Sequence, residues 1–410
     1  MKRALAVVAC AALGCGATPA SPRLDATVAG SDASMLPDGV GVGLPPGFFP
    51  AQRPAFAAAA DEPGTVQVSI SGESLAEHGY PYTSTPRSGA AVFVDGWELR
   101  FDRYLVVVDH VRLNRASPDP SMRASLGGLV ARADGPWIVD LHRHGSLTGA
   151  GGPPESATPV AVLRATVGGD TLDPSVRYAF SFDVAPAGPT VRNVNLGIDA
   201  ADDAARMIAS GWTTYFSGLA TYRGRPASSE SDPAFADYPT VVRFGFGFAA
   251  PASYLNCHNP ELGDADTAAN RGVQPSAAGH VRAQITMHTD HFFWDEADVE
   301  GTPLHFDPIA ARAHPAGVDA GAASPAVVTL ADLAGDLPAS LTDSVGRGVR
   351  DRGGQTQGVV DDSPPPSYAV RGAGAMVHDL RDFVRYNARG GGHLNSDGLC
   401  AVQANGPLGD

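Results

Sequence analysis

Short strand-like runs recur at close spacing through the first two-thirds of this chain, and turn signals separate them. TVQVSI at 65–70 alternates polar and apolar residues, as a half-buried strand does. YLVVVDHVRL at 104–113 is nearly continuous in Val and Leu, which indicates a strand buried on both faces over part of its length. An Asp-Gly pair between the runs at 91–94 and 97–101 predicts a hairpin. The pattern predicts an antiparallel β-sandwich or barrel-like domain rather than a parallel βα sheet.

Helical periodicity is confined to a few short segments. Residues 202–210 carry acids in their first turn and precede Gly211, and both features mark helix ends. Residues 375–387 (AMVHDLRDFVRYN) repeat apolar residues at helical spacing and form the best helix candidate. We therefore expect one mostly β domain over 63–405 with a few short helices and a C-terminal helix, and the sequence leaves open a helical extension over 326–400. Shorter helices are expected at 308–312, 330–335 and 339–345.

The N-terminus resembles a bacterial export signal. Lys2 and Arg3 precede a small apolar run at 4–13 that is too short to span a bilayer. Ala12-Leu13-Gly14-Cys15 then resembles a lipobox, which implies cleavage before Cys15 and lipidation of that residue. Residues 1–15 are thus predicted to be a lipoprotein signal peptide, and the Ala/Gly/Pro-rich stretch 16–62 a flexible tether. An ordinary signal peptide with an incidental Cys is the alternative.

This start predicts an exported protein of the bacterial cell envelope, at the periplasm or the outer surface. Its expected partner is a membrane, reached through the lipid anchor, and the sequence names no protein partner. The chain has 44 acidic and 29 basic residues, a net charge of −15. Such a balance gives no electrostatic reason to bind nucleic acid.

Two cysteines remain once Cys10 and Cys15 are assigned to the signal. Two cysteines in an oxidising compartment most often pair, so we expect a disulfide between Cys257 and Cys400. The alternative is that Cys257, which precedes His258, binds a metal ion.

The segment 281–308 concentrates side chains that bind metals. His288, Asp290, His291 and His305 follow the strand-like run VRAQITMH. Imidazole and carboxylate groups at the end of a strand suit a transition metal, with Asp290 as a ligand or as the acceptor that fixes an imidazole tautomer. A nearby thioether, that of Met287, would suit copper, whereas Asp290 would suit zinc.

Histidines elsewhere are further candidates. His110 follows Asp109 in the run at 104–113, and a hydrogen-bonded core histidine is its alternative interpretation. His142 and His144 would share one face of a strand, which suits a metal, although a solvent-facing loop pair is the alternative. The sequence contains no GxSxG, HExxH, P-loop or dinucleotide motif, which favours a binding protein over an enzyme.

Two segments are similar to those of a known family. GWTTY at 211–215 and HLNSDGLC at 393–400 look like the WxxGY-like and HLGSxxC-like segments of MbnP-type (methanobactin-associated) exported copper-binding proteins. The resemblance implies a β-sandwich, an exported location and a metal role for His393.

We therefore predict a lipid-anchored envelope protein that binds copper or zinc through a histidine cluster. A metal-dependent hydrolase with an open coordination position, and a metal-free structural or interaction lipoprotein, are the alternatives. The candidate ligands are His288, Asp290, His291, His110, His142, His305 and His393.

Overall fold

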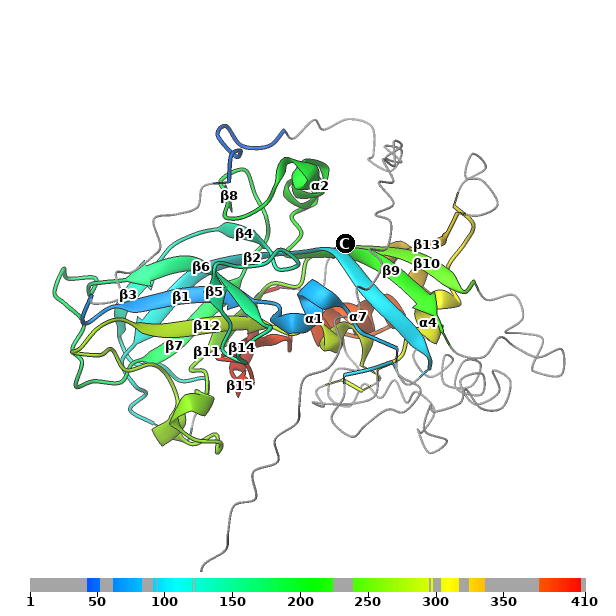
Figure 1. Cartoon of the computed structure of the whole chain (residues 1–410). Coiled ribbons are helices and arrows are strands. Elements are labelled where there is room, and N and C mark those ends of the chain that lie inside the picture. The colour runs from blue at the N-terminus through cyan, green and yellow to red at the C-terminus, as the bar shows by residue number, and fades with distance from the viewer. Residues whose placement is uncertain are drawn as a thin grey trace, which may run out of the picture. The chain divides into compact units, whose positions relative to one another are not determined.

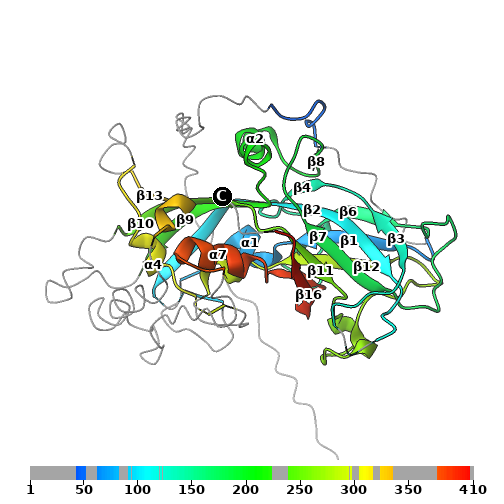
Figure 2. The ribbon, with the colours of Figure 1, turned by 180° about the vertical axis from the view of Figure 1, so that it is seen from behind.

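The strands lie in two mixed sheets that pack face to face (Figures 1 and 2). This confirms the mostly β class, and of the two architectures predicted the described residues form the sandwich. The computed structural model describes residues 43–51, 62–82, 91–93, 95–119, 121, 123–223, 239–294, 296–297, 304–316, 324–335 and 376–406. The signal peptide predicted at 1–15 and the helix predicted at 339–345 lie outside these residues.

The smaller sheet has a parallel pair at its centre. Its strands in spatial order are β15 (Gly398–Leu399), β14 (Gly392–Leu394), β12 (Val281–Met287), β1 (Val66–Ser71), β6 (Ser156–Leu163) and β5 (Leu147–Thr148). β1 and β12 run parallel, whereas β12 pairs antiparallel with β14. The prediction of a purely antiparallel sandwich is therefore corrected. Parallel strands need a long crossover connection, which here is most of the larger sheet.

The larger sheet has ten strands organised around one long strand. Seven lie in the order β13 (Ala326–Thr329), β10 (Val241–Phe248), β9 (Thr214–Tyr222), β2 (Trp97–Asn114), β7 (Ala179–Val184), β11 (Ala252–Leu255) and β16 (Ala401–Ala404). β3 (Leu129–Ala133) and β4 (Trp137–Asp140) also pair with β2, and β8 (Arg192–Asn193) pairs with β4. β13 runs parallel to β10 and β8 parallel to β4.

The strand β2 joins the two runs predicted at 97–101 and 104–113 into 18 continuous residues. Its N-terminal half pairs with β9 and its C-terminal half with β7. A register shift lies between Phe101 and Arg103 and another between Asp109 and Arg112. Because a bulge bends a strand and increases its twist, one strand can serve both halves of a twisted sheet.

The main core fills the space between the two sheets. Val66, Val68 and Ile70 of β1 alternate with polar residues and are fully buried there. Phe216 of β9 and Phe182 of β7 meet them from the larger sheet. The period of two along a strand explains why every second residue faces this core. Burying one such large apolar side chain contributes about 1.5–3 kcal/mol to the free energy of folding.

A second, smaller core lies on the other face of the larger sheet, under α2 (Ala201–Ser210). Met207 and Ile208 of this helix pack with Val107 of β2, and Gly211 ends the helix with a positive φ of 65°. The helix predicted at 202–210 is thus confirmed. Phe48 is also buried in this core, so the described residues 43–51 pack on the sheet although they belong to the stretch predicted as a tether.

Other helical segments are short. The remaining α-helices are α1 (Glu73–His78), α4 (Asp307–Ala310) and α7 (Leu380–Ala388). The 3-10 helices are η1 (Ile198–Ala200), η2 (Pro260–Leu262), η3 (Ala268–Asn270), η4 (Asp290–Phe293) and η5 (Leu330–Leu333). α7 is the predicted C-terminal helix, begun five residues later than predicted and capped by Asp379, whose side chain accepts the Asp382 N–H. Among the described residues no helix has the length and hydropathy needed to cross a bilayer.

The hairpin predicted around Asp95-Gly96 is wrong. Phe93 forms a parallel bridge with Leu304, and β2 begins only at Trp97. Asp95 instead accepts hydrogen bonds from the backbone N–H groups of Phe306 and Asp307, at 2.6 and 2.7 Å. The predicted turn is present, since the Gly96 N–H donates to the Phe93 carbonyl at 3.3 Å, but the Asp95 side chain holds it against Phe306 and Asp307.

A disulfide between Cys257 and Cys400 closes the C-terminal hairpin onto the fold, as predicted, with an S–S distance of 1.98 Å. Cys257 follows β11, and Cys400 lies between β15 and β16. The bridge spans 143 residues of sequence. It ties the end of the hairpin formed by β14 and β15 to the segment after β11, and it stabilises the fold by restricting the unfolded chain.

Replacing both cysteines by Ser should lower the free energy of unfolding by about 3–5 kcal/mol, since the lost cross-link closes a loop of more than 100 residues. Urea unfolding of the double variant and of the oxidised wild type measures this difference. Wild-type protein treated with a reductant should resemble the variant, and an unchanged midpoint in both would contradict a stabilising bridge.

Candidate metal centre

The register between β12 and β14 brings two distant histidines together. Thr286 of β12 lies directly opposite His393 of β14. His288 follows Thr286 by two residues and therefore projects from the same face, diagonal to His393. The two imidazole ring centres are 4.2 Å apart. Gly392 permits this pairing, because a Cβ there would lie 2.4 Å from the ring of Tyr254.

The turn η4 positions the third histidine. Phe292 stacks on Phe216 at 4.2 Å between ring centres and anchors the turn in the main core. Asp290 accepts the backbone N–H of His291 at 3.0 Å, which orients the start of the turn. The His291 ring is held against Trp294, with ring centres 3.6 Å apart.

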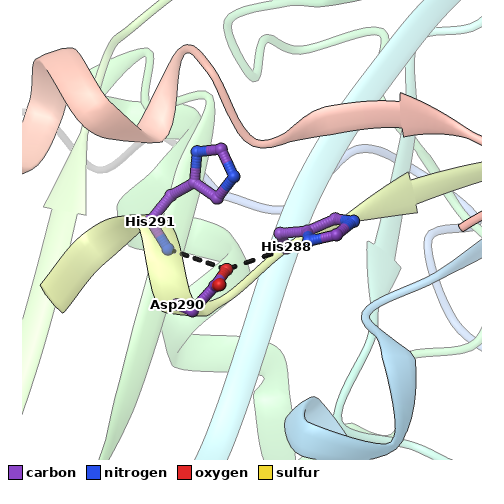
Figure 3. Close-up of side chains that lie close together, drawn as sticks. All are labelled: His288, Asp290 and His291. Carbon is purple, nitrogen blue, oxygen red and sulfur yellow. Dashed lines mark hydrogen bonds and ion pairs between the residues drawn. The ribbon is translucent and has the colours of Figure 1, made fainter. Parts of the chain in front are cut away.

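We call His288, Asp290, His291 and His393 the histidine cluster. The His291 ring centre lies 5.6 Å from each of the other two imidazoles. The Asp290 carboxylate lies between His288 and His291, and its Oδ1 is 3.8 Å from Nδ1 of His288 (Figure 3). One donor atom from each of His288, Asp290 and His291 lies within 4.8 Å of the other two. The three histidines are 9%, 1% and 2% exposed, so all three rings lie in the protein interior.

Backbone carbonyls determine which nitrogen of each ring carries the hydrogen. Nε2 of His288 faces the carbonyl of Ser396 at 3.1 Å, Nδ1 of His291 faces that of Asn387 at 3.3 Å, and Nε2 of His393 faces that of Gly390 at 3.2 Å. A carbonyl can only accept, so each of these nitrogens carries the hydrogen. In a neutral ring the other nitrogen then presents a lone pair, which is the arrangement that metal-binding histidines use.

Burial keeps two of the rings neutral. Burial, and then the charges of His393 and His288, hold the pKa of His291 well below its usual value. Burial and the neighbouring His288 lower the pKa of His393 to about 3. A metal ion at these two rings therefore does not compete with a proton at neutral pH.

His288 has the opposite tendency. Burial lowers the pKa of this ring, but the carboxylates of Glu73 and Asp290 outweigh that effect, and the net pKa is raised. Burial in turn raises the pKa values of Glu73 and Asp290, and His288 opposes the shift in both. The carboxylates and His288 thus share protons that a divalent cation would displace.

A second set of donors lies on the other side of His288. Nε2 of His288 is 3.7 Å from Oε1 of Glu73, and one donor atom from each of Glu73, His288 and Asp397 lies within 4.8 Å of the other two. Sequence reasoning missed Glu73 and Asp397. Glu73 lies more than 200 residues before His288, and no spacing along the chain indicates such a contact.

Three predicted ligands lie elsewhere, which corrects the prediction for them. His110 is half-exposed on the second bulge of β2, where Nδ1 binds Asp183 at 3.0 Å. Nδ1 of His142 donates to the carbonyl of Ala76 at 2.9 Å. His305 is buried, with Nδ1 3.9 Å from Asp95. Each ring faces an acceptor from a distant part of the chain, which the sequence pattern could not reveal.

The thioether of Met287 is also not a candidate donor. Met287 is buried in the main core, on the face of β12 opposite to Thr286 and His288. Cys257 is bonded to Cys400 and supplies no thiolate. The donors that converge are therefore nitrogen and oxygen atoms.

Comparison of the chain with protein-family models, with curated proteins and with solved structures finds no match. The similarity of 211–215 and 393–400 to MbnP-type proteins stays a prediction. What this site can do is therefore argued from its own donors and their surroundings.

In the metal-free protein, the His393 ring should stay neutral from about pH 5 to pH 8, because its pKa lies at about 3. Nitrogen chemical shifts of the ring, assigned with a His393→Gln variant, measure this. In the urea-unfolded chain the same histidine should titrate near the usual value of about 6.5. A midpoint between about 5 and 7 in the folded protein would contradict the buried neutral ring.

Proposed function

We propose that this protein binds one transition-metal ion, zinc or copper(II), in the histidine cluster. The observation that supports this most is the clustering of three buried imidazoles, whose ring centres lie 4.2 to 5.6 Å apart and each of which turns one nitrogen to a backbone carbonyl. The Asp290 carboxylate adds a negatively charged oxygen. Three nitrogens and one oxygen are a donor set that zinc and copper(II) both accept.

The donor set favours binding over catalysis. His288, Asp290 and His291 supply three converging donors, and His393, whose ring centre lies 4.2 Å from that of His288, would supply a fourth, the number that fills a tetrahedral zinc site. A hydrolytic zinc site keeps one position open for water. Storage, delivery or structural use of the ion is therefore the function that we favour. An absorption spectrum of the cobalt-substituted protein distinguishes a closed four-coordinate site from a site with an open position.

We also propose that the protein acts in the bacterial envelope, held to a membrane through a lipid on Cys15. The supporting observations are the lipobox-like sequence and a disulfide that suits an oxidising compartment. A metal site with histidine donors would there meet metal ions before they enter the cell.

Untagged wild-type protein should carry about one zinc or copper ion per chain, and a His288→Ala/His291→Ala double variant should carry almost none. Elemental analysis of both proteins, after circular dichroism shows that the variant is folded, measures this. A His142→Ala/His144→Ala variant removes the same number of rings outside the cluster and should keep its metal.

Wild-type protein that binds far less than one ion, and is equally stable to heat with and without zinc or copper, would instead support a metal-free structural role. At a metal concentration 100 times the dissociation constant, binding should add about 2.7 kcal/mol to the free energy of unfolding.

A Cys15→Ser variant should move from the membrane fraction to the soluble fraction of a bacterial host, because the acyl anchor is lost. Cys10→Ser removes the other N-terminal cysteine and should leave the protein on the membrane. Fractionation, with a mass spectrum of the N-terminal peptide, measures both. Equal distribution of wild type and Cys15→Ser would contradict lipidation at this residue.

A further inference from the structure

Glu73, His288 and Asp397 form a second group of donors, which we call the outer group. Asp397 is exposed and the side chain of Glu73 is 21% exposed. His291 and His393 are almost fully buried. The outer group therefore meets solvent, and His288 belongs both to it and to the buried group that contains His291.

The chain holds the outer group in an unusual backbone conformation. Asn395 and Ser396, which precede Asp397 in the turn between β14 and β15, both have positive φ angles, 50° and 73°. Glu73 also has a positive φ, 60°. Non-glycine residues in this region are strained by about 1–3 kcal/mol each, and such strain concentrates at functional sites.

Polar contacts compensate for this strain. Asn395 exchanges two hydrogen bonds with the backbone of Gln284, both at 2.8 Å. The N–H of Ser396 donates to Thr286 at 3.0 Å, and the N–H of Glu73 donates to Ser71 at 2.9 Å. The positions of Asp397 and of the Ser396 carbonyl are therefore fixed by the same strands that carry the histidine cluster.

His288 belongs to both groups of donors. Its Nδ1 faces Asp290 at 3.8 Å and its Nε2 faces Glu73 at 3.7 Å. A neutral imidazole has only one lone pair, so it can bind a cation through one nitrogen at a time. The nitrogen that carries the hydrogen decides whether His288 serves the outer group or the histidine cluster.

We infer that the outer group captures a divalent transition-metal ion from solvent and passes it through His288 into the histidine cluster; this rests on the function proposed above. At capture, Nε2 binds the ion with Glu73 and Asp397 while Nδ1–H donates toward Asp290. For transfer, Nε2 releases the ion, takes up a proton from solvent and donates to the Ser396 carbonyl, while Nδ1 gives its proton through the Asp290 carboxylate to solvent and binds the ion. The ring has gained no net proton, and no electron has moved.

The charges around His288 suit this path. The carboxylates of Glu73, Asp397 and Asp290 each have an oxygen within 4.8 Å of a nitrogen of His288. Glu155 adds a further negative charge near Glu73. A carboxylate surface attracts hydrated cations and raises their rate of association, by about 10- to 1,000-fold in focused sites. Buried imidazoles then replace the water molecules that a captured ion still holds.

The rate of loading tests the inference with Cu²⁺ as the probe, because a bound copper ion should quench the fluorescence of Trp294 beside His291. In stopped-flow mixing, a Glu73→Gln/Asp397→Asn variant should load at least about ten-fold more slowly than wild type. Its final stoichiometry and its dissociation constant should stay within about three-fold of the wild-type values. Because the association rate constant falls, the dissociation rate constant should then fall in proportion. Asp170→Asn, which removes an exposed carboxylate elsewhere, should load at the wild-type rate.

Two results would overturn the capture path. Loading of the Glu73→Gln/Asp397→Asn variant at the wild-type rate would show that ions enter elsewhere. Loss of stoichiometric binding in that variant would show that these carboxylates are permanent ligands. Wild-type stoichiometry, measured separately at equilibrium, tests the histidine cluster itself, so failure of the proposed function is distinguished from failure of the path.

A second variant isolates the outer group. His291→Gln/His393→Gln removes the buried rings and leaves Glu73, His288 and Asp397 in place. It should bind Cu²⁺ about as fast as wild type but with weaker affinity, and electron paramagnetic resonance should report fewer nitrogen ligands. Binding that is as tight as in wild type would contradict transfer to the interior.

Discussion

The pairing of β12 with β14 is the constraint on which the site depends. Without the register that sets Thr286 opposite His393, the C-terminal imidazole would lie far from His288. A slip of one residue would turn His393 to the other face of the sheet. The strand β14 has only three residues, so its own ladder cannot hold this register.

Contacts outside the ladder supply what β14 lacks. The Cys257–Cys400 bridge ties the end of the hairpin to the segment after β11, and the two bonds between Asn395 and Gln284 fix its turn. The N–H of His258 also donates to the carbonyl of Leu399 at 2.9 Å. The export machinery and the metal site are therefore linked in the proposal, because an oxidising compartment forms the bond that positions His393.

The sequence predicted what depends on local pattern. Short alternating runs predicted the sandwich. The position of His288, Asp290 and His291 directly after the strand β12 predicted the centre of the candidate site. The remaining members come from long-range pairing. His393 was suggested only by a family resemblance, and Glu73 had no signal at all. The predictions for His110 and His142 were wrong because their ring nitrogens bind groups that are distant in the sequence, the Asp183 carboxylate and the Ala76 carbonyl.

The bulges of β2 illustrate the same limit. The sequence indicated two strands at 97–101 and 104–113, since a bulge interrupts the alternation of side chains as a turn does. The pairing of β2 with β9 and with β7 shows that it is one continuous strand. His110 sits in the second bulge with a φ of 42°, and its ring binds Asp183.

The charges of the site give a physical reason for it to bind a cation. Burial raises the pKa of Asp290, which means that ionising it in the folded protein has a cost. The neutral His291 and His393 cannot offset that cost, and His288 can offset it only in part. A divalent cation in the histidine cluster would neutralise the Asp290 carboxylate and bind the neutral rings at once. The same burial that disfavours the bare site therefore strengthens its hold on a metal ion and couples that ion to the stability of the fold.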